Sequence, residues 1–538
     1  MCYNNVIKIF GGVFMDRTIY FGGDIITLED NLYIESLLVE NGIIKEIDTF
    51  DNLIEKYKDT KLFNLNGATM LPAFIDPHSH LSGLGLTTKF AKLQNAKSFE
   101  DIKNIILKFA KDNNIPKNEW IIGFGYDHNN LKEKIHPDKF VLDSIGIENP
   151  ILLTHTSGHM GIVNQKALDL FNINENTKDQ PGGKIGRVKN SNEPNGYLEE
   201  NKFISKCATV YNPTQNDIKE MINKAQNIYA SYGITTAQEG LLTPKELTML
   251  QCGDNIIDKI GYVDIKNYPN LLQEQKHYFK QYNNGIKLLG YKAFLDGSPQ
   301  GKTAWLTKPY ENEKDYKGYP IYEDKELINF FKKALIENVQ ILVHCNGDAA
   351  CEQFIRCYKQ AKEETNSNNN IRPVMIHAQL LRKDLLPLIK QLNIIPSYFV
   401  AHTYYWGDIH IKNLGKRAYN ISPLNSSKKL DIIYTLHQDT PVIMPNMIET
   451  IWCATNRITK DGISIGKDEI VEPIDAIKAI TINASYQYFE EDIKGSIKIG
   501  KQANFVILSK NPLKIPTNEI KNIEVLKTIK LDKVIFEK

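Results

Sequence analysis

Apolar runs the length of strands alternate with amphipathic stretches of helical period through the middle of this 538-residue sequence. Residues 340–344 and 374–377 are short enough to be buried strands, whereas residues 217–231 and 324–338 have the apolar spacing of helices that cover a sheet. Parallel strands need a crossover of helix length between them, so this alternation is typical of parallel β/α units. The sequence therefore predicts an α/β fold with about one barrel's complement of strands.

The individual elements follow from the same periodicity. The strand candidates are residues 74–76, 120–124, 151–154, 234–237, 290–295, 340–344, 374–377, 395–400 and 442–444, and the helix candidates are 99–111, 217–231, 324–338 and 383–392. The segment 123–203 is rich in Asn, Gly and charged residues, and it separates the second strand from the third by more than a βα loop needs. We therefore place an insertion near residues 123–203.

Both ends of the chain are short strands and turns instead. Asn41-Gly42 lies between two apolar runs and is a strong hairpin signal, and residues 503–508 and 531–536 are short strands near the other end. Domain termini commonly lie close together. We predict one small sheet domain built from residues 17–70 and 485–538, with the barrel at 71–484.

Composition excludes several kinds of partner. The 65 Lys and Arg residues against 64 Asp and Glu leave a formal charge of +1, which argues against binding to nucleic acid or to an anionic membrane and favours a small-molecule substrate. Seven Cys without a CxxC pair fit a reducing cytoplasm rather than a disulfide framework. The opening residues are too interrupted for a signal sequence, and Met15 is an alternative start. The oligomeric state is open, with a homodimer as the default.

Histidines end several of the predicted strands. In Phe74-Ile-Asp-Pro-His-Ser-His80, side chains two apart on a strand share a face, so His78 and His80 can meet one metal ion. This pair alone fits equally well two histidines that cap a strand by hydrogen bonding. His344 and His377 also end apolar runs, at the carboxyl edge where barrels carry their functional groups. Four such imidazoles together favour a metal of the zinc class.

Lys292 and Asp439 complete the candidate set. A buried ammonium is unfavourable and repels a cation. A neutral Lys292 amine can instead react with carbon dioxide to give a carbamate, an anion able to bridge two metal ions. Asp439 precedes another apolar run, where its carboxylate can hold a metal ion and accept a proton. The sequence leaves open whether Lys292 is carboxylated, and therefore whether the site holds one zinc ion or two.

These residues resemble the amidohydrolase superfamily, and within it the amidohydrolase 3 group that includes N-substituted formamide deformylase-like proteins. The resemblance spans nearly the whole chain, and its most specific motifs are Leu71-Pro-Ala-Phe-Ile-Asp-Pro-His-Ser-His80, Ser157-Gly-His-Met-Gly-Ile-Val-Asn164, Lys292-Ala-Phe-Leu-Asp-Gly-Ser298, His344-Cys-Asn-Gly-Asp-Ala349 and Ala401-His-Thr-Tyr-Tyr-Trp-Gly-Asp408. It implies a (β/α)8 TIM barrel with a small β-sandwich from both termini. It also implies metal ligands from the first, fourth, fifth, sixth and eighth strands: His78, His80, Lys292, His344, His377 and Asp439.

The sequence departs from the family pattern in one place. Where the family usually has a small pair before the last aspartate, this chain has His437-Gln438. The bulk of this pair either narrows the site or brings His437 against the substrate. Four further residues are candidate substrate contacts because they follow strands or lie in the insertion: Tyr126, His159, Ser298 and His402. The aromatic segment after His402 fits a packed loop equally well.

From this set we predict a metal-dependent amidohydrolase. Metal-activated hydroxide would attack a non-peptide amide, such as an N-formyl or N-acyl amine, and Asp439 would carry the proton from water to the leaving nitrogen. A deaminase of a cyclic amidine or nucleobase is one alternative, but deaminases of this superfamily generally lack a lysine bridge. A non-catalytic metal-binding barrel is another, although it predicts a broken ligand set.

Overall fold

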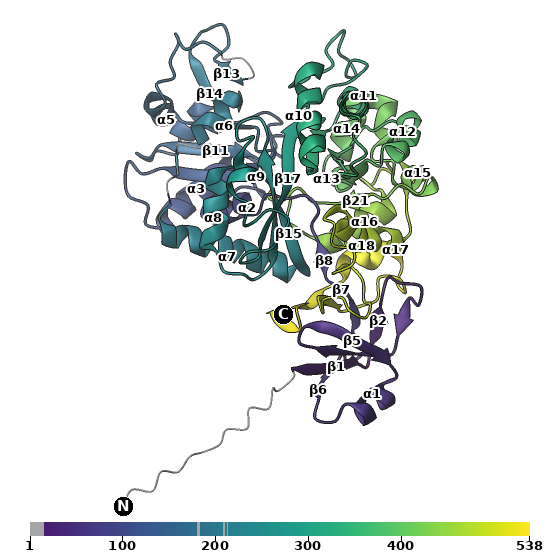
Figure 1. The fold of residues 1–538 in the computed structure, drawn as a ribbon. Helices are drawn as coiled ribbons and strands as arrows, with labels where there is room; N and C mark the ends of the chain where they lie inside the picture. Colours follow the sequence, from purple (N-terminus) through teal and green to yellow (C-terminus); the bar gives the residue numbers. More distant parts are fainter. Residues whose placement is uncertain (1–15, 180–182, 208–209, 212) are drawn as a thin grey trace, which may run out of the picture.

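A parallel sheet of eight strands lies at the centre of the protein (Figure 1). The structure, a computed structural model, describes residues 16–179, 183–207, 210–211 and 213–538. The opening segment, with its predicted alternative start at Met15, lies outside these residues. Within the described ranges, no helix combines the length and the apolar character needed to cross a membrane.

Strands and helices alternate along this central sheet, as the periodicity predicts. In sheet order the strands are β8 (Phe74–Ile75), β15 (Ile234–Leu242), β16 (Asp258–Asp264), β17 (Ile286–Phe294), β18 (Gln340–Cys345), β19 (Val374–His377), β20 (Ile395–Tyr398) and β21 (Thr435–Leu436). The helices that follow them are α2 (Leu81–Thr87), α7 (Gln215–Ser231), α8 (Pro244–Cys252), α9 (Leu271–Glu274), α10 (Asp324–Glu337), α11 (Asp348–Thr365), α12 (Leu386–Gln391), α13 (His402–Tyr405), α14 (Gly407–Leu414), α15 (Leu424–Lys429), α16 (Met447–Asn456), α17 (Pro473–Ala479) and α18 (Ile482–Gln487).

The sheet curls until its two outer strands, β8 and β21, come close together. At one end, Gln487 of α18 donates to Pro77 O (2.8 Å) after β8 and accepts from Thr435 Oγ1 (2.9 Å) on β21. At the other end, His80 N donates to Thr440 O (2.7 Å). Apolar side chains from the strands fill the space inside, together with Tyr488 after α18. The outer strands are therefore held together by side chains and loops.

A second sheet of six strands is inserted between β8 and β15. Its order is β13-β14-β12-β11-β10-β9, and it forms the blue lobe in Figure 1. Its elements are β9 (Ala91–Lys92), α3 (Phe99–Asp112), β10 (Ile121–Tyr126), α4 (Lys139–Asp143), β11 (Ile151–His155), β12 (Met160–Val163), α5 (Gln165–Leu170), β13 (Gly183–Arg187), β14 (Pro194–Glu200) and α6 (Asn201–Cys207). The insertion thus begins before residue 123.

The predicted strands at 120–124 and 151–154 are confirmed as β10 and β11, but their assignment to the barrel was wrong, because they belong to the inserted sheet and not to the central one. They are as apolar as central strands because they are buried in a core of their own. The segment 442–444 is not a strand, and β21 lies just before it. β16 escaped prediction because its buried Asp258 and Lys259 interrupt the apolar pattern.

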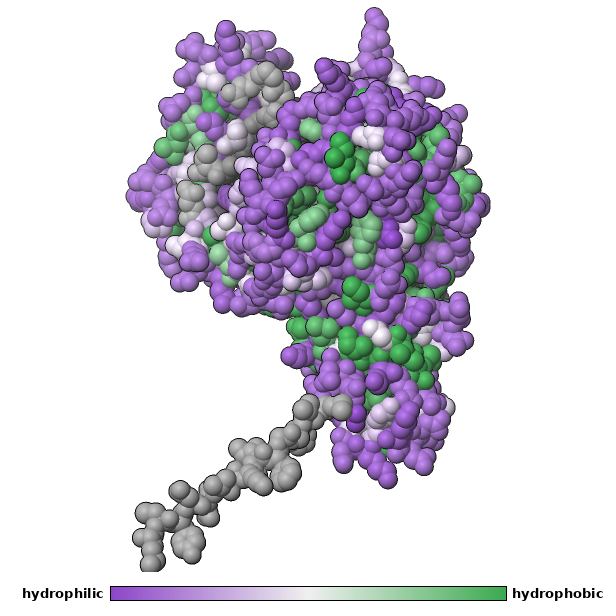
Figure 2. All heavy atoms as spheres, viewed as in Figure 1, coloured by the Kyte–Doolittle hydropathy of each residue, from purple (hydrophilic) through white to green (hydrophobic). Residues whose placement is uncertain are grey.

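Strands from both chain ends pair with each other in the small part of the molecule. One sheet has the order β5-β4-β1-β6 and the other β24-β23-β22-β7-β2-β3, and both contribute to one hydrophobic core. Hydrophobic residues also gather where this part meets the main body (Figure 2). The elements are β1 (Arg17–Phe21), β2 (Asp24–Ile26), β3 (Tyr33–Ile34), β4 (Ser36–Glu40), β5 (Ile43–Asp48), α1 (Phe50–Lys56), β6 (Lys61–Asn64), β7 (Thr69–Pro72), β22 (Phe505–Leu508), β23 (Val525–Lys530) and β24 (Lys533–Glu537).

A buried ion cluster joins the central sheet to the C-terminal segment. Lys494 Nζ lies 2.7 Å from Asp258 on β16 and 3.1 Å from Glu490, and Lys530 on β23 also reaches Asp258 at 2.7 Å. Burial alone would lower the pKa of Lys494, but these two carboxylates raise it overall. The ammonium is therefore charged and neutralised in place.

Removing one member of this cluster leaves the others buried without compensation. We expect Lys494→Met to lower the free energy of unfolding by about 3–5 kcal/mol, measured by urea denaturation. Lys498→Met is the matched control, because Lys498 is 62% exposed and its ion pair with Glu29 spans 3.6 Å, so its change should stay below about 1 kcal/mol. Equal free energies of unfolding for the two variants would contradict a stabilising role for the cluster.

Candidate metal centre

Six of the predicted residues come together at the carboxyl edge of the central sheet. His78 and His80 follow β8, Lys292 lies on β17, and the other three lie on or just after later strands. Counted from β8, they come from the first, fourth, fifth, sixth and eighth strands: His78, His80, Lys292, His344, His377 and Asp439.

The carboxylate of Asp439 is the point on which the imidazoles converge. Its Oδ1 lies 3.3 Å from His78 Nε2 and 3.4 Å from His80 Nε2, and its Oδ2 lies 3.9 Å from His377 Nε2. Oδ1 is buried and has no hydrogen-bond partner. Burial would raise the pKa of Asp439, but the imidazoles of His377, His80 and His78 hold it well below its ordinary value. The site thus presents an ionised carboxylate oxygen without a proton donor.

Lys292 and His344 extend the cluster on its other side. Lys292 Nζ lies 3.2 Å from His78 Nε2, and His344 Nδ1 lies 3.1 Å from His377 Nε2. Burial lowers the pKa of Lys292 to about 7, so a large fraction of the amine is neutral at pH 7. Burial also lowers the pKa of His344 to about 3, so this imidazole is neutral.

Gln238, on β15, fixes the proton of His78. Its Nε2 donates to Pro77 O (2.7 Å) and to Tyr488 Oη (3.0 Å), which leaves its Oε1 to accept from His78 Nδ1 at 2.6 Å. Nδ1 of His78 therefore carries the proton, and the lone pair of Nε2 faces Asp439. Gly240 follows on the same strand, and a Cβ there would lie 2.6 Å from His78 Cε1. The strand can pass so close to the imidazole only because residue 240 lacks a side chain.

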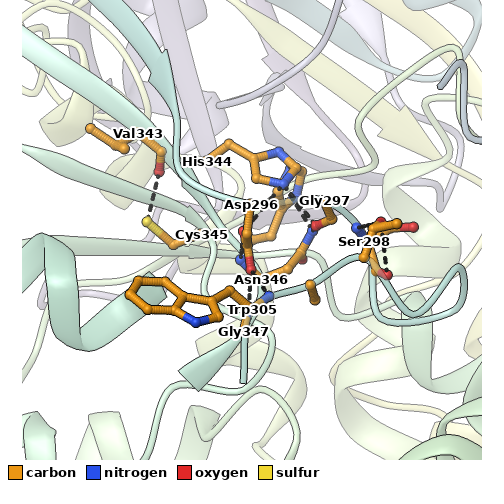
Figure 3. A network of polar contacts seen from close by, with 12 residues as sticks. Asp296, Gly297, Ser298, Trp305, Val343, His344, Cys345, Asn346 and Gly347 are labelled. Carbon is orange, nitrogen blue, oxygen red and sulfur yellow. Dashed lines mark hydrogen bonds and ion pairs between the residues drawn. The ribbon is translucent and has the colours of Figure 1, made fainter. Parts of the chain in front are cut away.

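His344 is oriented by the loop that follows β17 (Figure 3). Its Nε2 lies 3.1 Å from Gly297 O, a carbonyl that can only accept, so Nε2 carries the proton and Nδ1 keeps a lone pair. Asp296 anchors this loop by accepting from the backbone N–H groups of Asn346 (2.9 Å) and Gly347 (2.7 Å), while Asn346 Nδ2 donates to Gly297 O (2.8 Å).

His437 lies behind His377 rather than against a cavity. It is fully buried, with Nε2 3.1 Å from His377 Nδ1 and Nδ1 2.8 Å from Ser397 Oγ. Both nitrogens have protein partners, so the structure gives His437 a supporting position instead of the substrate contact that we expected. When His437 carries its proton on Nδ1, its Nε2 accepts a hydrogen bond from His377 Nδ1–H. The lone pair of His377 Nε2 then faces the site.

The backbone at two of these positions is unusual. His377 has φ 72° and Asp439 has φ 53°, in the left-handed region that residues with a Cβ seldom occupy. Such conformations persist where the surroundings over-determine them, and they cluster at functional sites. The chain turns sharply at the ends of β19 and β21 and thereby aims both side chains at the same point.

The donor set fits a divalent cation of the zinc class. Neutral imidazole nitrogens and a carboxylate oxygen are ligands that zinc and its neighbours prefer. Nε2 of His78 and Nε2 of His377 both lie near Asp439, whose Oδ1 lacks a donor, and His344 Nδ1 lies 3.1 Å from His377 Nε2. His78, His344 and His377 are also held from behind by hydrogen bonds, as in metal sites. Among the described residues, His78, His377 and Asp439 form one of two groups with such converging atoms.

The remaining predicted substrate contacts are His402, Ser298, His159 and Tyr126, and they lie beside Phe399, in the loop after β17 and in the inserted sheet. His402 packs on Phe399, which also contacts the His377 and His437 rings. Ser298 follows Gly297 in the loop that holds His344 (Figure 3). Their contacts with substrate stay predictions.

The inserted sheet supplies the remaining two. His159 Nδ1 lies 3.0 Å from Glu200 Oε2. Burial alone would lower the pKa of His159, but Glu200 and the charge of Asp439 raise it overall. Tyr126 is fully buried, and its hydroxyl lies 3.0 Å from His136 Nδ1 in a separate cluster. Tyr126 is therefore not part of this centre.

Sequence reasoning missed the residues that hold the ligands in place. Gln238 and Glu239 follow an apolar run at the carboxyl end of a predicted strand, the same signal that identified His344. Asp296 lies inside one of the family-like motifs. The local sequence does not distinguish a glutamine that supports a ligand from one on the surface. The contact between Gln238 and His78 therefore became evident only from the fold.

Comparisons with known proteins agree with this geometry. A model of the amidohydrolase family matches residues 61–536. The chain is 29% identical over 557 residues to amidohydrolase YtcJ of Bacillus subtilis, covering 97% of this chain and 100% of the relative. It is 22% identical over 498 residues to N-substituted formamide deformylase of Arthrobacter pascens, covering 87% and 89%.

A solved structure has the same fold. An uncharacterized metal-dependent hydrolase from Pyrococcus horikoshii superposes with a TM-score of 0.75 at 23% identity, covering 93% of this chain and 99% of that one. The family model covers most of the chain, and the carboxyl edge of the central sheet carries the residues that the resemblance implied. This chain belongs to the amidohydrolase family.

Proposed function

We propose that this protein is a metal-dependent hydrolase of a non-peptide carbon–nitrogen bond, in an N-formyl or N-acyl amine. The observation that carries the proposal is the convergence of three imidazoles on an ionised, unpartnered carboxylate, with His344 and the Lys292 amine in contact with two of these imidazoles. The relative named N-substituted formamide deformylase favours this class of amide. In this proposal the central sheet acts as a (β/α)8 barrel, and the two terminal sheets form a small β-sandwich beside it.

The imidazoles and Asp439 would hold one or two divalent ions, with zinc as the best match to the donors. A cation bound there supplies Lewis acidity, which polarises the amide carbonyl and lowers the pKa of water toward about 7. The protein's part is to fix the ligands. Outer hydrogen bonds from Gln238, Gly297 and Ser397 keep the imidazole lone pairs directed inward, so little reorganisation accompanies binding.

Asp439 is placed to move the proton. Its Oδ1 has no donor of its own and faces the site, so it can accept a proton from the attacking water and deliver it to the leaving nitrogen. The side chains of His80, 27% exposed, and Asp439, 15% exposed, are the most accessible of the ligand candidates. A substrate would therefore enter on the side of the centre formed by these two residues.

A cavity of about 530 Å³ lies beside this side of the centre. It is bounded by α2, which follows His80, by Pro441 and Val442, which follow Asp439, and by Thr156 and Asp127 of the inserted sheet. We propose that the substituents of the substrate occupy this cavity. Its position explains why the inserted sheet belongs to the catalytic unit.

The substrate class can be tested with a panel of N-substituted formamides, N-acyl amino acids and cyclic ureas, assayed with the zinc-loaded protein. We expect turnover of one acyclic amide class, detected as released formate, carboxylate or amine, and loss of that activity after chelation with recovery on adding Zn²⁺. Ammonia released from a cyclic amidine, without amide hydrolysis, would favour a deaminase and sink the proposal.

The role of Asp439 can be tested by Asp439→Asn. The amide keeps the shape and one oxygen ligand but cannot take a proton, so we expect kcat to fall about 10²–10⁴-fold with the fold retained. Asp475→Asn is the matched control, because this carboxylate is about as exposed (18%) but pairs with Lys428 on α15 and lies outside both the six-residue centre and the cavity lining, so its kcat should change less than tenfold. Near-normal turnover by Asp439→Asn would refute the assignment.

The state of Lys292 can be read directly. A neutral amine adds carbon dioxide and loses one proton, giving an N-carboxylate anion, and the pKa of about 7 makes the neutral form available. We expect the zinc-loaded protein grown with ¹³C-bicarbonate to show a carbamate ¹³C resonance that Lys292→Met lacks. Lys259→Met should keep it, because Lys259, also buried with a pKa near 8, contacts Gln226 and backbone carbonyls instead of imidazoles. A zinc-loaded wild type without the resonance would exclude the bridge.

A further inference from the structure

A second group of histidines with an aspartate lies in the inserted sheet. Among the described residues it is the other group whose ligand atoms converge: Asp127, His128 and His155. Asp127 and His128 directly follow β10, and His155 ends β11, its parallel neighbour. The three residues therefore meet at the carboxyl edge of the inserted sheet, as the first group does on the central sheet. From this arrangement we propose a second site for a divalent cation of the zinc class.

One atom from each residue points at the same spot. His128 Nδ1 lies 3.3 Å from His155 Nε2, and Asp127 Oδ1 lies 3.7 Å from His155 Nε2 and 3.9 Å from His128 Nδ1. Zinc bonds to nitrogen or oxygen are near 2.0–2.1 Å, so two ligands at a tetrahedral angle lie about 3.4 Å apart. The aspartate separations are too long for hydrogen bonds but suit ligands spread around a shared ion.

The aspartate is held by contacts outside this triangle. Asp127 Oδ1, the atom of the triangle, accepts from the backbone N–H (2.9 Å) and the Nδ2 (3.1 Å) of Asn129, and Asp127 Oδ2 accepts from Asn130 Nδ2 at 3.3 Å. The strand also bulges at Gly125, with φ +94°, which shifts the register of β10 against β11. A bulge of this kind re-aims the side chains that follow it, here toward β11. Metal ligands are typically held by such outer hydrogen bonds.

Burial and access fit an ion as well. The side chains of His155 and Asp127 are only 3% and 9% exposed, while His128 is 22% exposed and opens a route from solvent. Two nitrogens and one oxygen leave a fourth position for water, and this donor set selects Zn²⁺ or Co²⁺ over Mg²⁺ or Ca²⁺. His136 stacks on His128 with ring centroids 3.9 Å apart but contributes no atom to the triangle.

The site lies on the wall of the catalytic cavity. Asp127 and Thr156 both line that cavity, and Thr156 Oγ1 donates to Val442 O (3.2 Å), three residues after Asp439. A cation that joins β10 to His155 would therefore stiffen the contact between the inserted sheet and the loop of Asp439. This inference does not depend on the proposed hydrolase activity.

The cluster also has a metal-free arrangement, which the experiment must separate from the site. Ser157 Oγ and Ser157 N lie 2.9 Å and 3.1 Å from His155 Nδ1. If the backbone N–H of Ser157 donates to Nδ1, the His155 proton sits on Nε2 and is donated to His128 Nδ1. If Nδ1–H donates to Ser157 Oγ instead, Nε2 is free for the ion. The two arrangements differ in whether a metal ion is bound.

Metal stoichiometry decides between them. We expect the wild type, equilibrated with Zn²⁺ and measured by plasma mass spectrometry, to carry one more ion per chain than His128→Gln. His136→Gln is the matched control and should keep the wild-type count. In a His78→Asn/His80→Asn background, where the first centre is impaired, Co²⁺ should still give a visible absorption band, and adding His128→Gln should remove it.

Crystals of the wild type soaked in Zn²⁺ provide a readout without any substitution. An anomalous peak between Asp127 and His155 is expected. An unchanged zinc count in a folded His128→Gln, or no anomalous peak at this position, would overturn the site and leave the metal-free arrangement. Both outcomes are independent of whether the protein hydrolyses an amide.

Discussion

The buried carboxylate of Asp439 is the constraint around which this protein is organised. It lies beside His78 and His377, whose pKa burial lowers, and one of its oxygens has no donor. An isolated anion in such surroundings is expensive, and a buried charge is normally paired or bound to metal. The polypeptide adopts left-handed backbone at Asp439 and His377 to bring these groups together. Backbone strain and the desolvation of a charge are thus concentrated at one point, where a bound cation would compensate the buried charge.

The imidazoles around Asp439 are held in place by residues that do not themselves face the carboxylate. Gln238 cannot turn its amide, because both of its donors are engaged by Pro77 and Tyr488, so the His78 proton stays on Nδ1. Gly297 imposes the opposite tautomer on His344. These contacts come from β15 and from the loop after β17, so several strands must be in register before the lone pairs converge. The site is therefore a property of the whole central sheet.

This dependence explains what the sequence could reveal. His344 and His377 could be predicted because each ends an apolar run, and the end of such a run can be located from the sequence alone. Most of the central strands and the helices near 99–111, 217–231 and 324–338 were confirmed for the same reason. β16 was missed because it contains two charged residues whose partners the sequence does not reveal. Asp258 pairs with Lys494, more than 200 residues away, and Lys259 donates to backbone carbonyls. The supporting role of His437 likewise depends on Ser397 and His377, which only the fold brings beside it.

The inserted sheet shows the limit most clearly. Its strands near 120–124 and 151–154 are as apolar as those of the central sheet, since each sheet buries its strands in a core of its own. Periodicity reports burial, not the sheet in which a strand is buried. Histidines that end strands therefore occur in both sheets, and the same sequence signal that identified His78, His344 and His377 also marks Asp127, His128 and His155. Because the insertion leaves the central sheet directly after His80 and α2, the carboxyl edge of the inserted sheet, with Asp127 and Thr156, lines the same cavity as Pro441 and Val442, which follow Asp439.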